Sequence, residues 1–152
     1  VFETSFAHSD GRAAMVVVPN VPAVRKEQIC EEFPLYLTTG RVMSHYLTGV
    51  QTRKSPALAA RNIETFMEIH PTTAMKYNIQ DQSLVRIESR RGSVVVRSKW
   101  SETIRQDSIF VPFHWADSQN INLLVSKELD PTCKMPGFKL SVVKVSPVLD
   151  FR

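Results

Sequence analysis

Cysteine is scarce in this 152-residue chain: there are two, Cys30 and Cys133, and they lie far apart. No Cys-x-x-Cys pair is present, so the chain by itself does not supply a cysteine-framed zinc site or an iron–sulfur cluster. The sequence leaves open whether the two cysteines form a disulfide. Because no secretion signal is recognisable, we expect two free thiols in a reducing cytoplasm.

Long apolar runs are also absent. No stretch approaches the roughly 20 residues that a membrane-spanning helix requires, and the N-terminus has neither the basic nor the apolar segment of a signal peptide. The first residue is Val1 rather than an initiator methionine, so we expect a piece of a longer protein. These absences predict a cytoplasmic domain that has no membrane partner.

An excess of one charge is nearly absent as well. There are 19 Lys and Arg against 15 Asp and Glu, which gives a net charge of +4. The densest cationic groups are Arg53-Lys54 and Arg90-Arg91, and aromatic residues do not interleave with them, so we do not expect a nucleic-acid surface. The 43% hydrophobic and 22% charged residues are ordinary for a globular domain with a proper core.

What is present is a pattern of short strands and few helices. Strands are predicted at residues 15–18, 34–37, 66–69, 84–97, 109–113 and 140–145, with a hairpin turn at residues 90–92. Pro56 and Pro71 stand at the first positions of two short predicted helices, 55–63 and 70–78, and Asn78 suits a left-handed helix end. The pattern favours a mainly β fold, a small barrel with helices packed outside.

Residues 37–53 form the most informative segment, because they mix glycine with hydroxyl, cationic and aromatic side chains directly after a strand. Gly40 lets the backbone approach a pyrophosphate closely, and arginines offer planar, permanently charged groups to phosphate oxygens. The composition leaves open an ordinary turn followed by polar surface. The side chains that suit a phosphorylated, flat ligand are those of Thr38, Thr39, Arg41, His45, Tyr46, Thr48, Thr52 and Arg53.

The order of these residues resembles a known family. Thr39-Gly40-Arg41, followed by His45-Tyr46, Thr48-Gly49 and Thr52-Arg53, is similar to the start of the C-terminal molybdopterin-dinucleotide-binding domain of the dimethyl sulfoxide reductase family of molybdenum oxidoreductases. The resemblance continues in order through residues 68–71, 89–92, 112–116 and 136–139, nearly the whole chain. It implies a six-stranded double-psi β-barrel at residues 34–152, preceded by a lead-in strand and linker at residues 1–33.

The same resemblance implies the ligand contacts. It assigns cofactor binding to Thr39, Gly40, Arg41, His45, Thr48, Gln51, Thr52, His114, Asn122 and Lys139. His70, by contrast, is expected to cap or pack a helix start, and Lys139 could equally be a solvated surface lysine. Two positions depart from the family pattern: Leu47 stands where many members carry a second His, and Gln51 where many carry Met, so the local contacts there must differ.

Residues 44–53 and 113–117 are most similar to the assimilatory nitrate reductases of bacilli. This implies a lid domain that clamps molybdopterin guanine dinucleotide (Mo-bis-MGD) from one side, while absent domains hold the other side and the iron–sulfur cluster. The expected partners are those domains and an electron donor, and the chain alone is not expected to be catalytic. Two alternatives stay open: the same domain of a formate dehydrogenase, and a free-standing double-psi barrel acting as a binding module.

Overall fold

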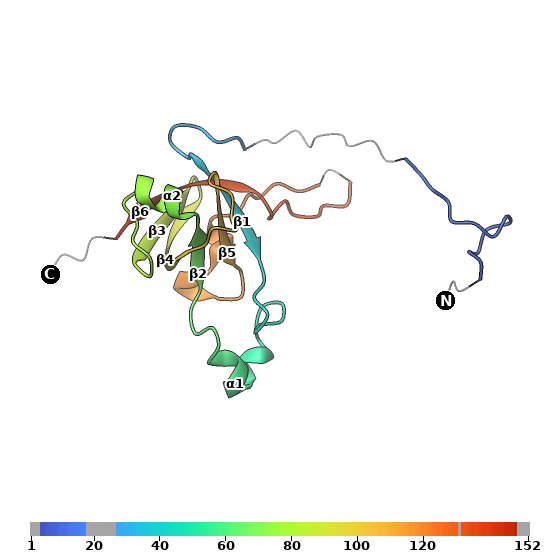
Figure 1. Cartoon of the computed structure of the whole chain (residues 1–152), viewed down its shortest axis with the longest axis horizontal. Coiled ribbons are helices and arrows are strands. Elements are labelled where there is room, and N and C mark those ends of the chain that lie inside the picture. The colour runs from blue at the N-terminus through green and yellow to red at the C-terminus, as the bar shows by residue number, and fades with distance from the viewer. Residues whose placement is uncertain (1–3, 18–26, 131, 149–152) are drawn as a thin grey trace.

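The computed structural model describes residues 4–17, 27–130 and 132–148, and its centre is a closed six-stranded barrel (Figure 1). The order of the strands around the barrel is β1-β5-β2-β4-β3-β6. Their bounds are β1 Leu35–Gly40, β2 Phe66–Ile69, β3 Leu84–Ser89, β4 Gly92–Trp100, β5 Ser108–Pro112 and β6 Ser141–Pro147. The mainly β barrel expected from the sequence is therefore confirmed.

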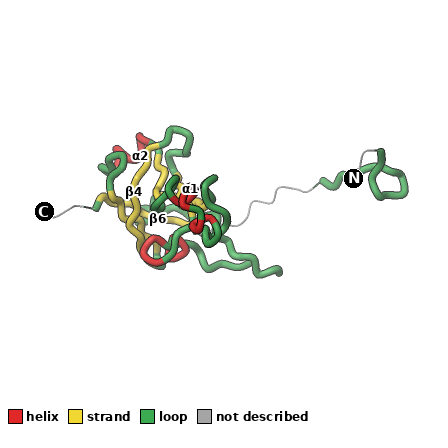
Figure 2. Tube along the Cα trace, turned by 90° about the horizontal axis from the view of Figure 1, so that it is seen from below, coloured by secondary structure: helices red, strands yellow, loops and turns green. Residues whose placement is uncertain are grey.

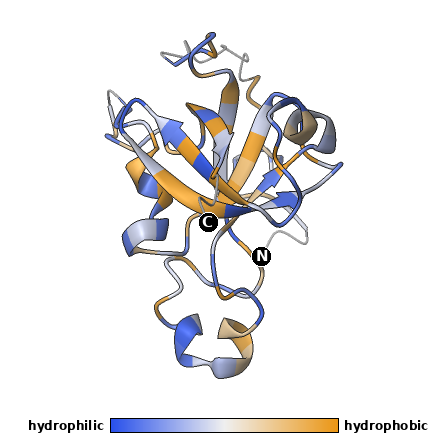
Figure 3. Ribbon diagram, turned by 90° about the vertical axis from the view of Figure 1, so that its left-hand side faces the viewer, coloured by the Kyte–Doolittle hydropathy of each residue, from blue (hydrophilic) through white to orange (hydrophobic). Residues whose placement is uncertain are grey.

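Alternating side chains fill the barrel. In β1, Leu35, Leu37 and Thr39 are buried while the residues between them are half-buried. Because successive side chains of a strand point to opposite faces, this period of two places one face of each strand in the core. Figure 3 shows hydrophobic residues concentrated along the strands. The buried core includes Leu35, Leu37, Met67, Ile69, Val85, Ile87, Val94, Val96, Ile109, Val111, Val143 and Val145.

Strand pairing brings the functional loops to one end of the barrel. β1 and β5 run parallel, with Gly40 opposite Pro112, so both strands end at the same place. β2 begins there too, because it runs antiparallel to β5, with Glu68 opposite Phe110. We call this the loop end of the barrel. The segments that follow β1 and β5, residues 41–65 and 113–140, leave from it.

Two short helices lie at the periphery of the strands (Figure 2). α2, Pro71–Lys76, begins at a proline as predicted, and the His70 side chain caps it by accepting a hydrogen bond from the Thr72 backbone N–H. The φ angle of Asn78 is +55°, which confirms the left-handed helix end. None of the helices in the described ranges has the length and apolar character needed to cross a membrane.

The first predicted helix, 55–63, is shorter than expected. α1 covers Pro56–Ala59, with Ser55 at the cap position but without a side-chain capping hydrogen bond. Asn62 lies in a loop, where its carbonyl group lies 3.2 Å from the His45 ring and its amide donates to the Ser44 hydroxyl. These contacts hold the chain in a non-helical path towards β2. The described residues also form three short 3-10 helices: η1 Thr52–Lys54, η2 Asp117–Gln119 and η3 Ile121–Leu123.

Two strand predictions need correction. The predicted strand at 15–18 is wrong over its described residues: Met15, Val16 and Val17 form no strand and are 78–92% exposed, because no strand pairs with them. Val18 and most of the predicted linker, 18–26, lie outside the described residues. The strand predicted at 34–37 continues to Gly40, so Thr38, Thr39 and Gly40 belong to β1 and not to a loop.

The segment before β1 reaches the barrel at its last residues. Figure 1 draws residues 4–17 apart from the barrel, but the ring of Phe33 is buried and the Glu27 carboxylate accepts hydrogen bonds from Arg91 and from the Val142 backbone N–H. These contacts join residues on both sides of the predicted boundary between the lead-in segment, 1–33, and the barrel domain, 34–152. That boundary stays a prediction. Cys30 and Cys133 are both free and exposed, as expected.

Candidate functional site

Two histidines from distant parts of the sequence meet at the loop end. His45 follows β1 and His114 follows β5, and their ring centroids are 5.5 Å apart. The indole of Trp115 packs edge-on against both, at 5.3 Å from His45 and 5.7 Å from His114. All three side chains are buried. The parallel pairing of β1 with β5 is what brings these residues together.

Both nitrogens of His114 are engaged within the chain. Nε2 accepts a hydrogen bond of 2.9 Å from the backbone N–H of Val42, and Nδ1 bonds to the carbonyl oxygen of Leu47. Since one partner is a donor and the other an acceptor, the ring is neutral with its hydrogen on Nδ1. Burial lowers the pKa of His114, and the nearby positive groups of His45, Arg53 and Arg41 lower it further, against the Leu47 carbonyl, which raises it.

His45 faces a different set of partners. Nε2 lies 3.2 Å from the carbonyl oxygen of Asn62, so Nε2 carries a hydrogen. Nδ1 lies 2.9 Å from the hydroxyl oxygen of Thr52, whose own hydrogen also reaches the carbonyl of Gly49 at 3.3 Å. His45 and Thr52, both predicted to bind the cofactor, therefore contact each other. Their polar atoms form hydrogen bonds within the chain.

Arg53 closes the same loop. Its guanidinium donates to the carbonyl oxygen of Thr48 at 2.9 Å and to the carbonyl oxygen of His114. Gly49 has a φ of +76°, which favours glycine, and a Cβ atom there would lie 3.1 Å from the guanidinium, so a larger residue would strain the turn and crowd Arg53. Composition favoured Arg53 as a phosphate ligand, but in the structure its donors bind backbone carbonyls.

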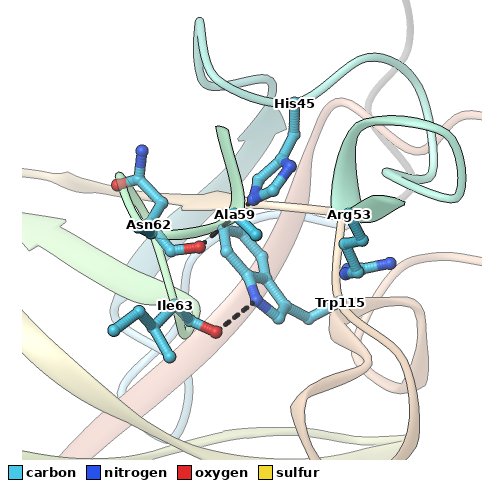
Figure 4. Close-up of a pocket in the computed structure, with 7 residues that line it drawn as sticks. His45, Arg53, Ala59, Asn62, Ile63 and Trp115 are labelled. Carbon is cyan, nitrogen blue, oxygen red and sulfur yellow. Dashed lines mark hydrogen bonds between the residues drawn. The ribbon is translucent and has the colours of Figure 1, made fainter. Parts of the chain in front are cut away.

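A cavity of about 370 Å³ opens beside His45 and Trp115. Figure 4 shows the rings of His45 and Trp115 close together in it, with Asn62 and Ile63 on one side and Arg53 on the other. The indole N–H of Trp115 donates to the carbonyl of Ile63 at 3.1 Å, which fixes the ring. Ala59 and Ala60 complete the lining. The cavity thus combines apolar walls and aromatic rings with one guanidinium.

The end of β1 carries the second group of predicted residues. The buried Thr39 hydroxyl donates to the carbonyl of Phe138 at 2.9 Å, and the Lys139 ammonium donates to the Thr39 carbonyl at 3.0 Å. Arg41 follows two positions later and is exposed. Within the described ranges, its guanidinium forms neither a hydrogen bond nor an ion pair. Two cations, Arg41 and Lys139, therefore flank the end of β1.

The structure gives Gly40 a reason other than ligand approach. A Cβ atom on Gly40 would lie 2.6 Å from Cε2 of Phe110, on the neighbouring strand. Glycine is therefore needed because the aromatic ring occupies the space of a side chain. This packing does not depend on a pyrophosphate.

Three of the residues predicted to bind the cofactor belong neither to the group around His45 and His114 nor to the group at the end of β1. The Thr48 and Gln51 side chains are exposed, and Thr48 contributes its carbonyl to Arg53. Asn122 is exposed on η3, whose next residue, Leu123, packs against Gly92 at the start of β4. No hydrogen bond in the described part of the chain joins the Asn122 side chain to either group. That these side chains contact a cofactor stays a prediction.

Sequence reasoning missed Asn62 and did not assign Trp115 to the site. Asn62 donates to the Ser44 hydroxyl at 2.7 Å and binds His45, which ties the segment before β2 to the segment after β1. Nothing in the local sequence marks this asparagine. Trp115 directly follows His114, and an aromatic residue beside a candidate ligand residue is the signal that could have found it.

Comparison with known proteins identifies the family. Residues 35–142 match the family model described as the molydopterin dinucleotide binding domain. The chain is 64% identical over 148 residues to the assimilatory nitrate reductase catalytic subunit of Bacillus subtilis (strain 168), a match that covers 97% of this chain and 21% of that protein. It is 41% identical over 122 residues to the F420-dependent formate dehydrogenase 1 subunit alpha of Methanococcus maripaludis, covering 80% of this chain and 18% of that protein.

A solved structure supports the fold. Acetylene hydratase from Pelobacter acetylenicus superposes with a TM-score of 0.68 at 18% sequence identity, over 77% of this chain and 19% of that one. Together with the closed strand order, this similarity confirms the predicted six-stranded double-psi barrel. The chain spans about a fifth of the length of the relatives that it matches. It belongs to the molydopterin dinucleotide binding domain family.

Proposed function

We propose that this chain is the cofactor-binding lid domain of a larger molybdenum-dependent nitrate reductase, and that it clamps one side of Mo-bis-MGD. The identity of 64% to a nitrate reductase subunit, against 41% to a formate dehydrogenase subunit, favours nitrate as the substrate of the whole enzyme. The relatives are about five times longer than the matched region, which favours a larger enzyme over a free-standing barrel.

The residues at the loop end fit such a cofactor. A dinucleotide brings a negative pyrophosphate, and the end of β1 presents Arg41 and Lys139, both exposed. Arg41 has five N–H donors without a partner in the described ranges, and the ammonium of Lys139 uses one donor on Thr39 and keeps others for a ligand. These two cations beside the end of β1 are the observation that carries the proposal, because charge-assisted hydrogen bonds to phosphate are the strong ones.

The cavity beside His45 and Trp115 fits a flat heterocycle. Ala59 and Ile63 contribute apolar side chains to the lining, and the fixed indole of Trp115 offers an aromatic surface. In this arrangement Arg41 and Lys139 would neutralise the phosphates, and the cavity would orient a ring. The chemistry that the molybdenum cofactor supplies when bound is the two-electron removal of oxygen from nitrate, which releases nitrite.

The remaining domains of the reductase would be the principal partners, with an electron-donor subunit or protein beyond them. We assign the iron–sulfur cluster to those domains, because this chain has only two cysteines and both are exposed and free. We propose the cytoplasm as the compartment. No role in binding nucleic acid or a membrane is proposed.

The experiment is to isolate the native protein that carries this sequence and to measure its mass, metal content and activity. We expect a polypeptide several times larger than 17.3 kDa that contains molybdenum and iron and reduces nitrate with a reduced dye as donor. Formate oxidation in place of nitrate reduction would transfer the proposal to formate dehydrogenase. A free 17.3 kDa protein without molybdenum would refute both and leave a binding module.

A further inference from the structure

We propose that His114 is a positioning residue whose neutral ring holds residues 42–53 against the end of β5, and that protonation of this ring releases them. We call residues 42–53 the pinned loop. The proposal rests on the proposed function only for its consequence, since the pinned loop follows Arg41 and carries His45 and Thr52. The release itself is a property of the chain.

One ring bridges two points of the pinned loop. Nε2 of His114 accepts from the Val42 N–H at 2.9 Å, and Nδ1–H donates to the Leu47 carbonyl. These partners lie 72 and 67 positions away in the sequence. The ring is only 2% exposed, so water does not readily replace either partner. The two bonds therefore set the path of the chain between Val42 and Leu47.

The acceptor of one of these bonds has an unfavourable backbone. Leu47 has a φ of +48°, in the left-handed region that non-glycine residues seldom adopt. Its side chain is 43% exposed, so packing does little to hold this conformation. The hydrogen bond from His114 to the carbonyl of Leu47 is the described contact that fixes it.

A proton on His114 would remove one bond and add repulsion. Nε2 would become a donor facing the Val42 N–H, which is also a donor, so that bond would be lost. The titratable and charged groups that act on the ring are His45 and Arg41, which follow β1, and Arg53 of η1. No carboxylate of a described residue stands among these groups. The neutral ring is thus compatible with the closed loop, and the cation is not.

The partners of His45 differ in kind from those of His114. Its Nε2 faces the carbonyl of Asn62, which accepts a hydrogen in either state of the ring. Its Nδ1 faces the Thr52 hydroxyl, which can accept a hydrogen while donating its own to Gly49. Neither partner of His45 is a backbone donor of the kind that faces Nε2 of His114. The effect of His45 on His114 is electrostatic, across 5.5 Å between the ring centroids, and it lowers the pKa of His114.

The sign of the pH dependence follows. In the released loop His114 has its ordinary pKa, near 6.5, whereas burial and the neighbouring cations lower that pKa in the closed loop. Opening therefore takes up a proton as the pH falls below about 6.5, and the open population rises about tenfold per pH unit until the lowered pKa is reached. Above about pH 7 the opening of the loop no longer depends on the protonation of His114.

Hydrogen–deuterium exchange of the full-length protein carrying this chain tests the proposal. Peptides covering residues 42–53 are followed from about pH 5 to 8, with rates corrected for intrinsic exchange, in samples with and without bound molybdenum. In the wild type we expect protection of these peptides to fall about tenfold per pH unit below pH 6.5. In His114→Gln, which keeps an acceptor and a donor but does not titrate, we expect no such step.

His70→Gln is the matched control, because His70 also accepts a backbone N–H, from Thr72 at 3.1 Å, but caps α2 away from the pinned loop. It should keep the wild-type step. His45→Gln should keep the onset near pH 6.5 but end the rise at a higher pH, so that the total loss of protection is smaller, because one charge that lowers the pKa of His114 in the closed loop is gone. This variant tests the proposal even if His114→Gln does not fold.

A flat wild-type profile, or the same step in His114→Gln as in the wild type, would overturn the proposal. A loss of protection in His45→Gln that reaches the same total as in the wild type would overturn the electrostatic part of the proposal. Because exchange is read with and without molybdenum, a step in a protein that binds no molybdenum would refute the proposed function and leave His114 as the positioning residue.

Discussion

The ammonium group of Lys139 donates a 3.0 Å hydrogen bond to the carbonyl oxygen of Thr39, 100 positions earlier in the chain. The Thr39 hydroxyl returns the contact by donating to the carbonyl of Phe138 at 2.9 Å. This pair of bonds fastens the segment before β6 to the end of β1. It also places the ammonium of Lys139 at Thr39, two residues before Arg41, and the proposed function needs positive charge at this end of β1.

Replacing Thr39 with valine should loosen this fastening. Valine keeps the shape of the buried side chain but removes the donor to Phe138, so we expect the free energy of unfolding to fall by about 1 kcal/mol. Urea unfolding followed by Trp fluorescence measures it. Thr38→Val is the control, because the Thr38 hydroxyl donates to no residue in the described ranges. Equal effects of the two changes would contradict a role for this bond.

Gly40→Ala should destabilise the barrel through a clash. The new Cβ atom would lie 2.6 Å from the Phe110 ring, so the ring must move, at about 1–3 kcal/mol of unfolding free energy. Adding Phe110→Leu to Gly40→Ala removes the obstructing ring atoms and should cost less than the sum of the single changes. A double-mutant cycle by denaturant unfolding measures this coupling. Strict additivity would show that Gly40 is required for another reason.

Arg41→Ala should reduce retention of the molybdenum cofactor in the full-length protein. Losing charge-assisted bonds to phosphate, worth about 1.5–3 kcal/mol, corresponds to a roughly 10- to 150-fold weaker affinity. The measurement is the molybdenum content of the purified protein after dilution and re-isolation. Arg86→Ala, which removes an exposed arginine on the outer face of β3, should retain the wild-type content. Unchanged content in Arg41→Ala would refute the assignment of Arg41.

Glu27 should make stability depend on pH in the acid range. Burial opposes ionisation of this carboxyl, but hydrogen bonds from Arg91 and Val142 and the charges of Arg91 and Arg90 lower its pKa below 4.5. Its stabilising contribution is therefore present above pH 4.5 and is lost as the pH falls through the lowered pKa.

Glu27→Gln should remove about 1.5–3 kcal/mol of unfolding free energy near neutral pH and much less in acid. Urea unfolding of the chain at several values from about pH 3 to 7 gives the curve. Glu31→Gln, which removes an exposed carboxyl, should leave the slope intact. If the unfolding free energy of Glu27→Gln depended on pH as steeply as that of the wild type, a group other than Glu27 would be the cause.

Local patterns in the sequence predicted most of the elements. The β3–β4 hairpin alternates Val85 and Ile87 with polar residues and turns at Arg90-Arg91, so its pairing follows from neighbouring residues alone. Pro71 and Asn78 likewise marked the start and end of α2 by their own backbone preferences. The strand predicted at 15–18 failed because β propensity needs a partner strand, which the fold does not provide to residues 15–17.

The sequence predicted which segments carry the residues of the candidate site, but not what those residues bind. The sequence placed His45, Thr52 and His114 in the right loops, and the structure brings these three together at the loop end. It could not show that their polar atoms bind the chain itself, nor that the guanidinium of Arg53 serves two backbone carbonyls. Those partners are fixed only when distant strands have paired.

The sequence by itself determined the periodic elements, the proline-started helices and the family to which the chain belongs, because each depends on residues close together or on their order. The tertiary structure alone decided that Gly40 lies against Phe110, that Glu27 meets Arg91, and that His114 faces a donor on one nitrogen and an acceptor on the other. The reason is that β1 pairs in parallel with β5, across nearly half of the sequence, and no local pattern encodes which groups such a closure brings into contact.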